Sequence, residues 1–282
     1  MSARVALTVA GSDPSGGAGI QADLATFAGR TTYGCAVVTA LTAQNTRGVT
    51  GVHPVPAAFV AQQLETLLDD VTVHAAKTGM LGSADVVHAV VDVLSRRPVG
   101  PLVVDPVMVA TSGDQLIDDD AVDAVRTALL PICDLLTPNV PEAARLLHVE
   151  QARAVDDLRD QAVALLDLGP GAVLVKGGHL AHALGESTDV LAVRGPGGGT
   201  SVHLSRRPLV ATSNTHGTGC TLSAALAAGA TTAGTTGAAP DWPALVEEAR
   251  DVLQAGLLHA DRLGVGSGNG PVSHGAYAWG EL

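Results

Sequence analysis

Short apolar runs alternate along this chain with longer segments of helical periodicity, and this alternation constrains the fold more than any other feature. Val5–Ala10 has the pattern of a buried strand, and Gly17–Ala28 follows it with its apolar residues on one helical face. Four more strand cores, each followed by a loop and a helical pattern, are Ala75–Lys77, Leu102–Asp105, Leu135–Thr137 and Val173–Lys176. Such an order predicts a mostly parallel sheet in an α/β/α sandwich.

Two further features complete the predicted architecture. Ala36–Thr42 is expected to be one strand, and Thr188–Val193 and Ser201–Leu204 flank the glycine-rich segment Gly195–Gly199 as an antiparallel hairpin at the sheet edge. Further helices are predicted at Ala57–Leu68, Thr218–Ala233 and Pro243–Leu263. Because the sequence has no internal repeat and no long linker, residues 1–282 are predicted to form a single domain.

Composition excludes several classes of function. The net charge of −12 argues against a nucleic-acid partner, which needs clustered Lys and Arg. No uncharged apolar stretch reaches the roughly 20 residues that span a bilayer, so no membrane contact is expected. The three cysteines form no CxxC pair or disulfide framework, which predicts a cytoplasmic protein.

Polar and glycine-rich segments follow nearly every predicted strand. In open α/β sheets, ligands bind beyond the carboxyl ends of the strands. The segments expected to converge there are Gly11–Gly19, Gln44–Asn45, Gly79–Met80, Asp105–Gly113, Asn139–Glu142, Lys176–His179 and Asn214–Cys220. The sequence therefore predicts one ligand site at this edge.

The sharpest of these segments is Asn214–Cys220, which leads into a predicted helix. Glycines before a helix let successive N–H groups point at one spot, and the helix dipole adds positive potential there. Gly217, Thr218, Gly219 and Cys220 would then form an anion hole, in which a thiolate at Cys220 is favoured. A helix cap with a buried structural cysteine explains the same residues equally well.

Two common nucleotide motifs are missing. No GxxxxGK[ST] sequence occurs, which argues against a P-loop kinase. The glycines of Gly11–Gly19 do not fit GxGxxG, which argues against a dinucleotide-binding fold. A glycine-rich bend with exposed backbone polar groups would instead suit a flat substrate.

Taken together, seven motifs resemble the hydroxymethylpyrimidine/phosphomethylpyrimidine kinases of thiamin synthesis, a branch of the ribokinase-like superfamily. In chain order they are AGSDPSGGAGIQADL, TALTAQNTRGV, KTGML, VVDPVMVATSGDQL, LTPNVPEA, LVKGGH and NTHGTGCTLSAALAA. The resemblance implies a ribokinase-like fold, use of ATP and Mg²⁺, and phosphorylation of a pyrimidine hydroxymethyl group and then of the monophosphate. It also implies a homodimer.

The resemblance implies a set of substrate-binding residues. Gly11 and Ala18 would supply backbone contacts near the pyrimidine, and Asp23 and Gln44 would hydrogen-bond its polar groups. Met80 and Val107 would pack on the ring faces. From residue type alone, Met80 and Val107 would be ordinary core, Gln44 a turn residue and Asp23 a solvated helix residue.

The nucleotide half is implied in the same way. Asn139 and Glu142 match the family's magnesium-organising Asn-x-x-Glu motif, and Asp105 would join that shell, although Pro106 makes a loop turn the alternative. Lys176 follows a buried apolar strand and would neutralise the nucleotide phosphates. Thr212 lies where the family contacts nucleotide.

Two alternatives remain open at this point. A pyridoxal, pyridoxine or pyridoxamine kinase would share the fold and also phosphorylate a hydroxymethyl group on an aza-ring. A non-catalytic ligand-binding protein would keep the fold, but Lys176, Glu142 and the Gly217–Cys220 turn are all present. One departure from the family's sequence pattern bears on phosphate binding, because Thr111 stands where the family commonly has a lysine.

Overall fold

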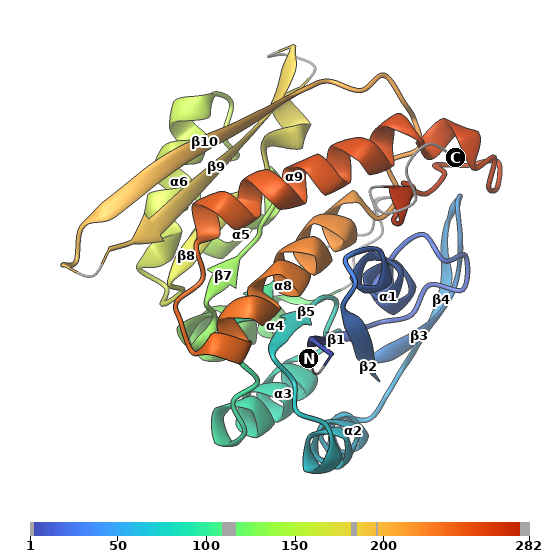
Figure 1. The fold of residues 1–282 in the computed structure, drawn as a ribbon, viewed down its shortest axis with the longest axis vertical. Helices are drawn as coiled ribbons and strands as arrows, with labels where there is room; N and C mark the ends of the chain where they lie inside the picture. The colour runs from blue at the N-terminus through green and yellow to red at the C-terminus, as the bar shows by residue number, and fades with distance from the viewer. Residues whose placement is uncertain (1–2, 109–116, 182–184, 196, 277–282) are drawn as a thin grey trace.

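A computed structural model describes residues 3–108, 117–181, 185–195 and 197–276, so the departure at Thr111 lies outside the described residues. An eight-stranded sheet of order β10-β9-β8-β7-β6-β5-β1-β2 dominates the described part (Figure 1). Its strands are β1 (Val5–Ala10), β2 (Tyr33–Val38), β5 (Ala75–Thr78), β6 (Leu102–Val104), β7 (Leu135–Leu136), β8 (Ala172–Val175), β9 (Glu186–Arg194) and β10 (Thr200–Pro208). The six strands from β8 to β2 pair in parallel.

Helices cover both faces of this sheet. One face packs against α1 (Gly19–Gly29), α8 (Thr218–Thr236) and α9 (Trp242–Leu258). The other face packs against α2 (Ala57–Asp70), α3 (Ala84–Arg96), α4 (Asp119–Ala124), α5 (Val140–Leu147) and α6 (Val155–Leu166). Successive strand residues point to opposite faces, so Val103 joins the first core and Val104 the second. The three-layer α/β/α prediction is confirmed.

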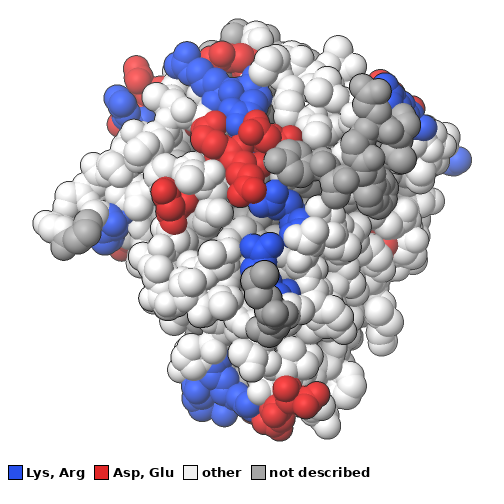
Figure 2. Space-filling model, viewed as in Figure 1, with Lys and Arg blue, Asp and Glu red and all other residues white. Residues whose placement is uncertain are grey.

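The antiparallel edge hairpin is also confirmed. β9 pairs with β8 and with β10, both antiparallel, and β10 is the last strand of the sheet. Arg207 of β10 forms ion pairs with Glu247 and Asp251 of α9. Figure 2 shows the same mixing of charge on the face that carries α9, where acidic and basic side chains lie side by side. This face therefore offers no broad basic area to a nucleic acid.

The single strand predicted at Ala36–Thr42 is wrong in its extent. β2 ends at Val38, and β3 (Ala40–Asn45) pairs with β4 (Gly48–Pro54) in a separate two-stranded sheet. Thr39 holds the break, because its N–H donates to Ala10 O and its hydroxyl donates to Met80 O at 2.6 Å. The chain thus leaves the main sheet at the carboxyl end of β2 and continues into the small sheet.

Helix bounds differ from the predictions by a few residues. α1 begins at Gly19, because Ala18 is its N-cap residue and has an extended backbone, with φ of −143° and ψ of −167°. α9 ends at Leu258, and a short 3-10 turn, Ala260–Arg262, follows it. Across the described ranges, every helix is too short or too polar to cross a lipid bilayer.

Candidate active site

A cavity of about 760 Å³ opens at the carboxyl ends of the parallel strands. Every segment that the sequence predicted to converge contributes at least one residue to its wall. The predicted site residues that line it are Gly11, Ala18, Gln44, Met80, Asp105, Val107, Asn139, Glu142, Lys176, Thr212, Gly217, Thr218, Gly219 and Cys220. Asp23 is the one predicted site residue that is not part of this wall.

The turn before α8 has the geometry that an anion hole requires. Gly217 precedes the helix with φ of 82°, a left-handed conformation that side chains rarely adopt. A Cβ atom at Gly217 would lie 1.8 Å from the Gly17 carbonyl oxygen, so only glycine allows this turn to pack against the Gly11–Gly19 loop. Thr218, Gly219 and Cys220 then form the first turn of α8, where N–H groups lack intrahelical partners.

A buried acid holds the two loops together. Asp13 accepts hydrogen bonds from the Ser15 and Ala18 N–H groups, and His216 Nε2 lies 2.7 Å from Asp13 Oδ2. Burial alone would raise the pKa of Asp13, but the hydrogen bonds from His216 and Ser15 lower it overall. The ionised carboxylate therefore holds the Gly11–Gly19 loop against the turn that precedes α8.

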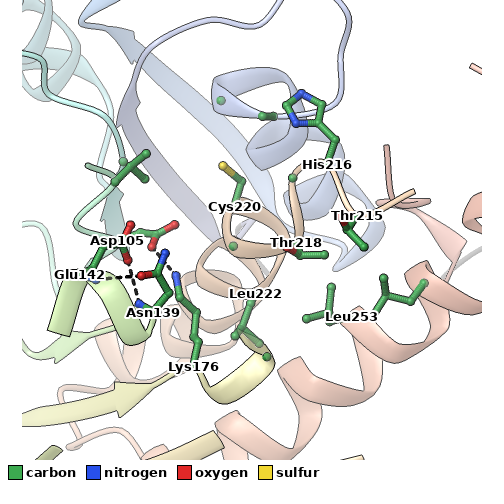
Figure 3. A pocket seen from close by; sticks show the side chains of 18 of the residues that line it. Asp105, Asn139, Glu142, Lys176, Thr215, His216, Thr218, Cys220, Leu222 and Leu253 are labelled. Carbon is green, nitrogen blue, oxygen red and sulfur yellow. Dashed lines mark hydrogen bonds and ion pairs between the residues drawn. The ribbon is translucent and has the colours of Figure 1, made fainter. Parts of the chain in front are cut away.

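A charged cluster lies beside this turn (Figure 3), so close that a Cβ atom at Gly219 would be 3.4 Å from Lys176 Nζ. Lys176 Nζ is 2.7 Å from Asp105 Oδ1, and Ser223 of α8 donates to Asp105 Oδ2. Burial would lower the pKa of Lys176, but Asp105 and Glu142 outweigh it, so the ammonium group is retained. Burial raises the pKa of Glu142 to about 7, against the opposing effect of Lys176.

The Asn-x-x-Glu motif has a structural role that its sequence did not reveal. Asn139 is the N-cap of α5, its side chain accepts from the Glu142 N–H at 2.9 Å, and Glu142 Oε2 accepts from the Asn139 N–H at 2.8 Å. This capping box fixes the carboxylate of Glu142 near Lys176 and Asp105. The described residues hold no group of three or more metal-ligating side chains.

Beyond Lys176 the cavity becomes apolar. Its wall here is built by Leu209, Val210, Leu222, Leu253 and Leu257. A buried ion pair between Arg250 and Asp189 borders this end, and Asp189 Oδ1 accepts from the Gly177 N–H at 2.9 Å. The pair thereby ties α9 to the residue that follows Lys176.

Cys220 differs from the expected thiolate. Burial raises the pKa of its thiol to about 11, and the nearby Lys77 only partly opposes this. The expectation that a helix start favours a thiolate is therefore wrong for the protein without ligands, because desolvation outweighs the helix dipole. The side chain nevertheless lines the cavity.

Asp23 lies behind the cavity wall. Its two carboxylate oxygens are each 2.9 Å from Lys77 Nζ, and Thr8 donates to Asp23 Oδ2 at 2.6 Å. Asp23 and Lys77 are both fully buried, and Lys77 contributes to the wall. In this structure, Asp23 faces the cavity only through Lys77.

The sequence analysis missed Lys77, the Asp13–His216 pair and the Arg250–Asp189 pair. The signal for Lys77 was available, because it ends a buried apolar strand in the same way as Lys176. Asp13 and His216 are 203 residues apart, and Asp189 and Arg250 are 61 apart, so no local pattern links them.

A sheet of this order, with a glycine turn beside a Lys–Asp–Glu cluster at its carboxyl edge, fits a small-molecule kinase of the ribokinase-like class. Comparisons with known proteins agree. A crystal structure of phosphomethylpyrimidine kinase from Clostridium difficile is 35% identical with a TM-score of 0.74, and covers 89% of this chain and 98% of that one. The structure of pyridoxal kinase from Staphylococcus aureus in complex with AMP-PCP and pyridoxal is 30% identical with a TM-score of 0.86, and the match covers 100% of this chain and 97% of that one.

Closer sequence relatives specify the family. The hydroxymethylpyrimidine/phosphomethylpyrimidine kinase of Escherichia coli strain K12 is 48% identical over 97% of this chain and 98% of its own length. The model of the phosphomethylpyrimidine kinase family matches residues 13–273. The chain belongs to the phosphomethylpyrimidine kinase family.

Proposed function

We propose that this protein transfers the γ-phosphoryl group of ATP to the hydroxymethyl group of 4-amino-5-hydroxymethyl-2-methylpyrimidine, and then phosphorylates the monophosphate to the diphosphate. The observation that carries this proposal is the layout of the cavity. Gln44 and Met80 line the same cavity as the Gly217–Cys220 turn, and the Lys176 cluster lies beside that turn.

The substrate end suits a flat polar heterocycle. Gln44 offers an amide to ring nitrogens or the amino group, and Met80 and Val107 offer apolar contact to the ring. Gly11 and Ala18 line the same cavity, and we keep them as residues near the pyrimidine. We propose that Asp23 contributes by holding the buried Lys77 in place rather than by touching the pyrimidine.

The nucleotide end suits ATP. Lys176 would neutralise phosphate oxygens, and Thr212 and Asn139 would contact the nucleotide. The side chains of Leu222, Leu253 and Leu257 would pack against the flat face of the base. Glu142 and Asp105 are hard oxygen ligands of the kind Mg²⁺ prefers, and both lie in this cluster. Since the described carboxylates already bind Lys176 and Asn139, the ion would be held largely through water and would neutralise phosphate charge.

Catalysis then rests on alignment and charge neutralisation. The Gly217, Thr218, Gly219 and Cys220 amides would bind the phosphoryl oxygens in flight. Cys220 Sγ would accept a hydrogen bond from the attacking hydroxymethyl group and orient its oxygen, and the hydroxymethyl proton would leave late to an oxygen of the transferred phosphoryl group, since a loose transition state demands little of a base. A thiol that is protonated at rest can orient the hydroxyl in this way without accepting its proton.

Pyridoxal kinase activity is the second candidate, because solved pyridoxal kinases share the fold at 30% identity. The curated relatives at 48% identity are named for the pyrimidine substrates, which favours the first candidate. The purified protein is given magnesium-ATP with hydroxymethylpyrimidine, its monophosphate or pyridoxal, and products are identified by mass. Pyridoxal phosphate as the sole product would refute the proposed function.

We further propose that residues 1–282 act as one domain in a cytoplasmic homodimer, as the family resemblance implies. Light scattering of the purified protein and fractionation of the source cells would check the oligomeric state and the compartment. A monomer at working concentration would contradict the first of these.

A further inference from the structure

Four cationic side chains line the cavity among the described residues: Lys77, Arg145, Lys176 and Arg250. Three of them are neutralised inside the protein. The carboxylates that pair with Lys77, Lys176 and Arg250 belong to acids whose side chains are 0%, 2% and 2% exposed. Arg145 differs, because its partner Asp119 is 94% exposed.

Arg145 lies on α5, three residues after Glu142, so the two side chains lie on one side of the helix. Its Nη2 atom is 2.7 Å from Asp119 Oδ1, in the first turn of α4. The arginine side chain is 28% exposed and reaches both the solvent and the cavity wall. It is therefore one helical turn from the cluster shown in Figure 3.

The two possible partners of Arg145 differ greatly in strength. An ion pair with a solvent-exposed carboxylate contributes little, because water screens it and long side chains lose freedom in forming it. A guanidinium that binds a phosphate in a partly closed cavity makes charge-assisted, often bidentate hydrogen bonds. Exchange of Asp119 for a phosphate is thus favourable, whereas Lys77 and Arg250 would each leave a buried carboxylate unpaired, and Lys176 would neutralise phosphate while it stays paired with Asp105.

We propose that Arg145 is a phosphate-binding residue of this cavity, held by Asp119 at rest and transferred to a ligand phosphate when that ligand binds. The phosphate belongs either to the nucleotide or to the monophosphorylated acceptor, and the identity of both ligands rests on the proposed function. Asp119 is then a competitor of the ligand. If the ion pair between α4 and α5 were purely structural, Asp119 would not compete with a ligand phosphate for Arg145.

Direct binding separates these roles. Calorimetry at low ionic strength would measure the affinities of magnesium-AMP-PCP, hydroxymethylpyrimidine monophosphate and unphosphorylated hydroxymethylpyrimidine. The variants are Arg145→Ala, Arg145→Lys and Asp119→Asn, with Asp120→Asn as the control that removes the same charge from the same turn of α4. Thermal unfolding of each variant checks that it is folded.

The proposal expects opposite changes from the two partners. Arg145→Ala weakens one phosphorylated ligand by about tenfold and leaves hydroxymethylpyrimidine unchanged, and Arg145→Lys recovers part of the loss. Asp119→Asn tightens the same ligand by about twofold to threefold, and Asp120→Asn by clearly less. The ligand that responds, AMP-PCP or the monophosphate, identifies the source of the phosphate.

Two results would overturn the proposal. If Arg145→Ala and Asp119→Asn weaken binding alike, the ion pair only supports the structure. If Arg145→Ala leaves both phosphorylated ligands unaffected, Arg145 does not bind phosphate. Failure of the proposed function would appear differently, as a wild-type protein that binds neither pyrimidine.

Discussion

Replacement of Glu142 by glutamine should stabilise the protein at high pH while impairing its use of magnesium. The Glu142 side chain is buried, and burial raises its pKa to about 7 from an ordinary 4.5. Glutamine keeps the acceptor oxygen that the Asn139 N–H needs, so the capping box survives. The variant therefore removes the charge and little else.

The sign and size follow from linkage. Between pH 4.5 and 7 the folded protein binds this proton more tightly than the unfolded chain, so stability falls as pH rises through that window. At 1.36 kcal/mol per pKa unit, ionised Glu142 costs the folded state about 3 kcal/mol above pH 7. Glu142→Gln should therefore raise the free energy of unfolding by an amount of that order at pH 8 and by almost nothing at pH 4.5.

Urea denaturation of both proteins without magnesium, in steps from pH 4.5 to 8, measures this difference directly. Other titrating groups cancel in the comparison, and Glu150→Gln, at an exposed glutamate, should show no such trend. At pH 8 the Glu142 variant should also need more magnesium for half-maximal turnover. A stability difference that is the same at pH 4.5 and pH 8 would refute the reasoning, because Glu142 would then ionise as an ordinary carboxyl.

Three further predictions concern the anion-hole turn and its support. Gly217→Ala should destabilise the protein by at least about 2 kcal/mol in urea denaturation, because the new side chain strains a left-handed residue and its Cβ meets the Gly17 carbonyl oxygen. Gly219→Ala is the control, since its Cβ would lie 3.4 Å from Lys176 Nζ. A smaller loss of stability for Gly217→Ala than for Gly219→Ala would contradict this prediction. Iodoacetamide should modify Cys220 slowly at pH 7.5 and faster toward pH 11, as mass spectrometry of digests would report; rapid modification at pH 7.5 would mean that the thiolate is already present. His274 supports this turn, since its Nδ1 atom lies 2.8 Å from Thr221 Oγ1 in α8. Burial lowers the pKa of His274 to about 4 from 6.5, so its contribution to stability should be lost as pH falls from 6.5 toward 4, and the wild type should lose more stability over that window than His274→Gln.

Much of the site was predictable because parallel strands place their carboxyl ends together. Each loop with unusual residues after a strand could be assigned to one edge before any coordinates were known, and the cavity wall bears this out. The same rule would have found Lys77, which lies next to the last residue of β5, much as Lys176 follows β8. The break at Thr39 was not predictable, since Ala36–Thr42 is one continuous β-forming run and only the contacts to Ala10 and Met80 divide it.

The sequence by itself determined the order of strands and helices around the main sheet, the glycine turn before α8 and the family, because these depend on local periodicity and on motifs in a row. Only the tertiary structure decided the electrostatic state of the side chains. Desolvation and partners distant in the chain decide whether Cys220 keeps its proton and whether Asp23 contacts a ligand or Lys77. They also decide whether Arg145 pairs with an exposed or a buried acid. Those quantities arise from packing, and no local pattern of residues encodes them.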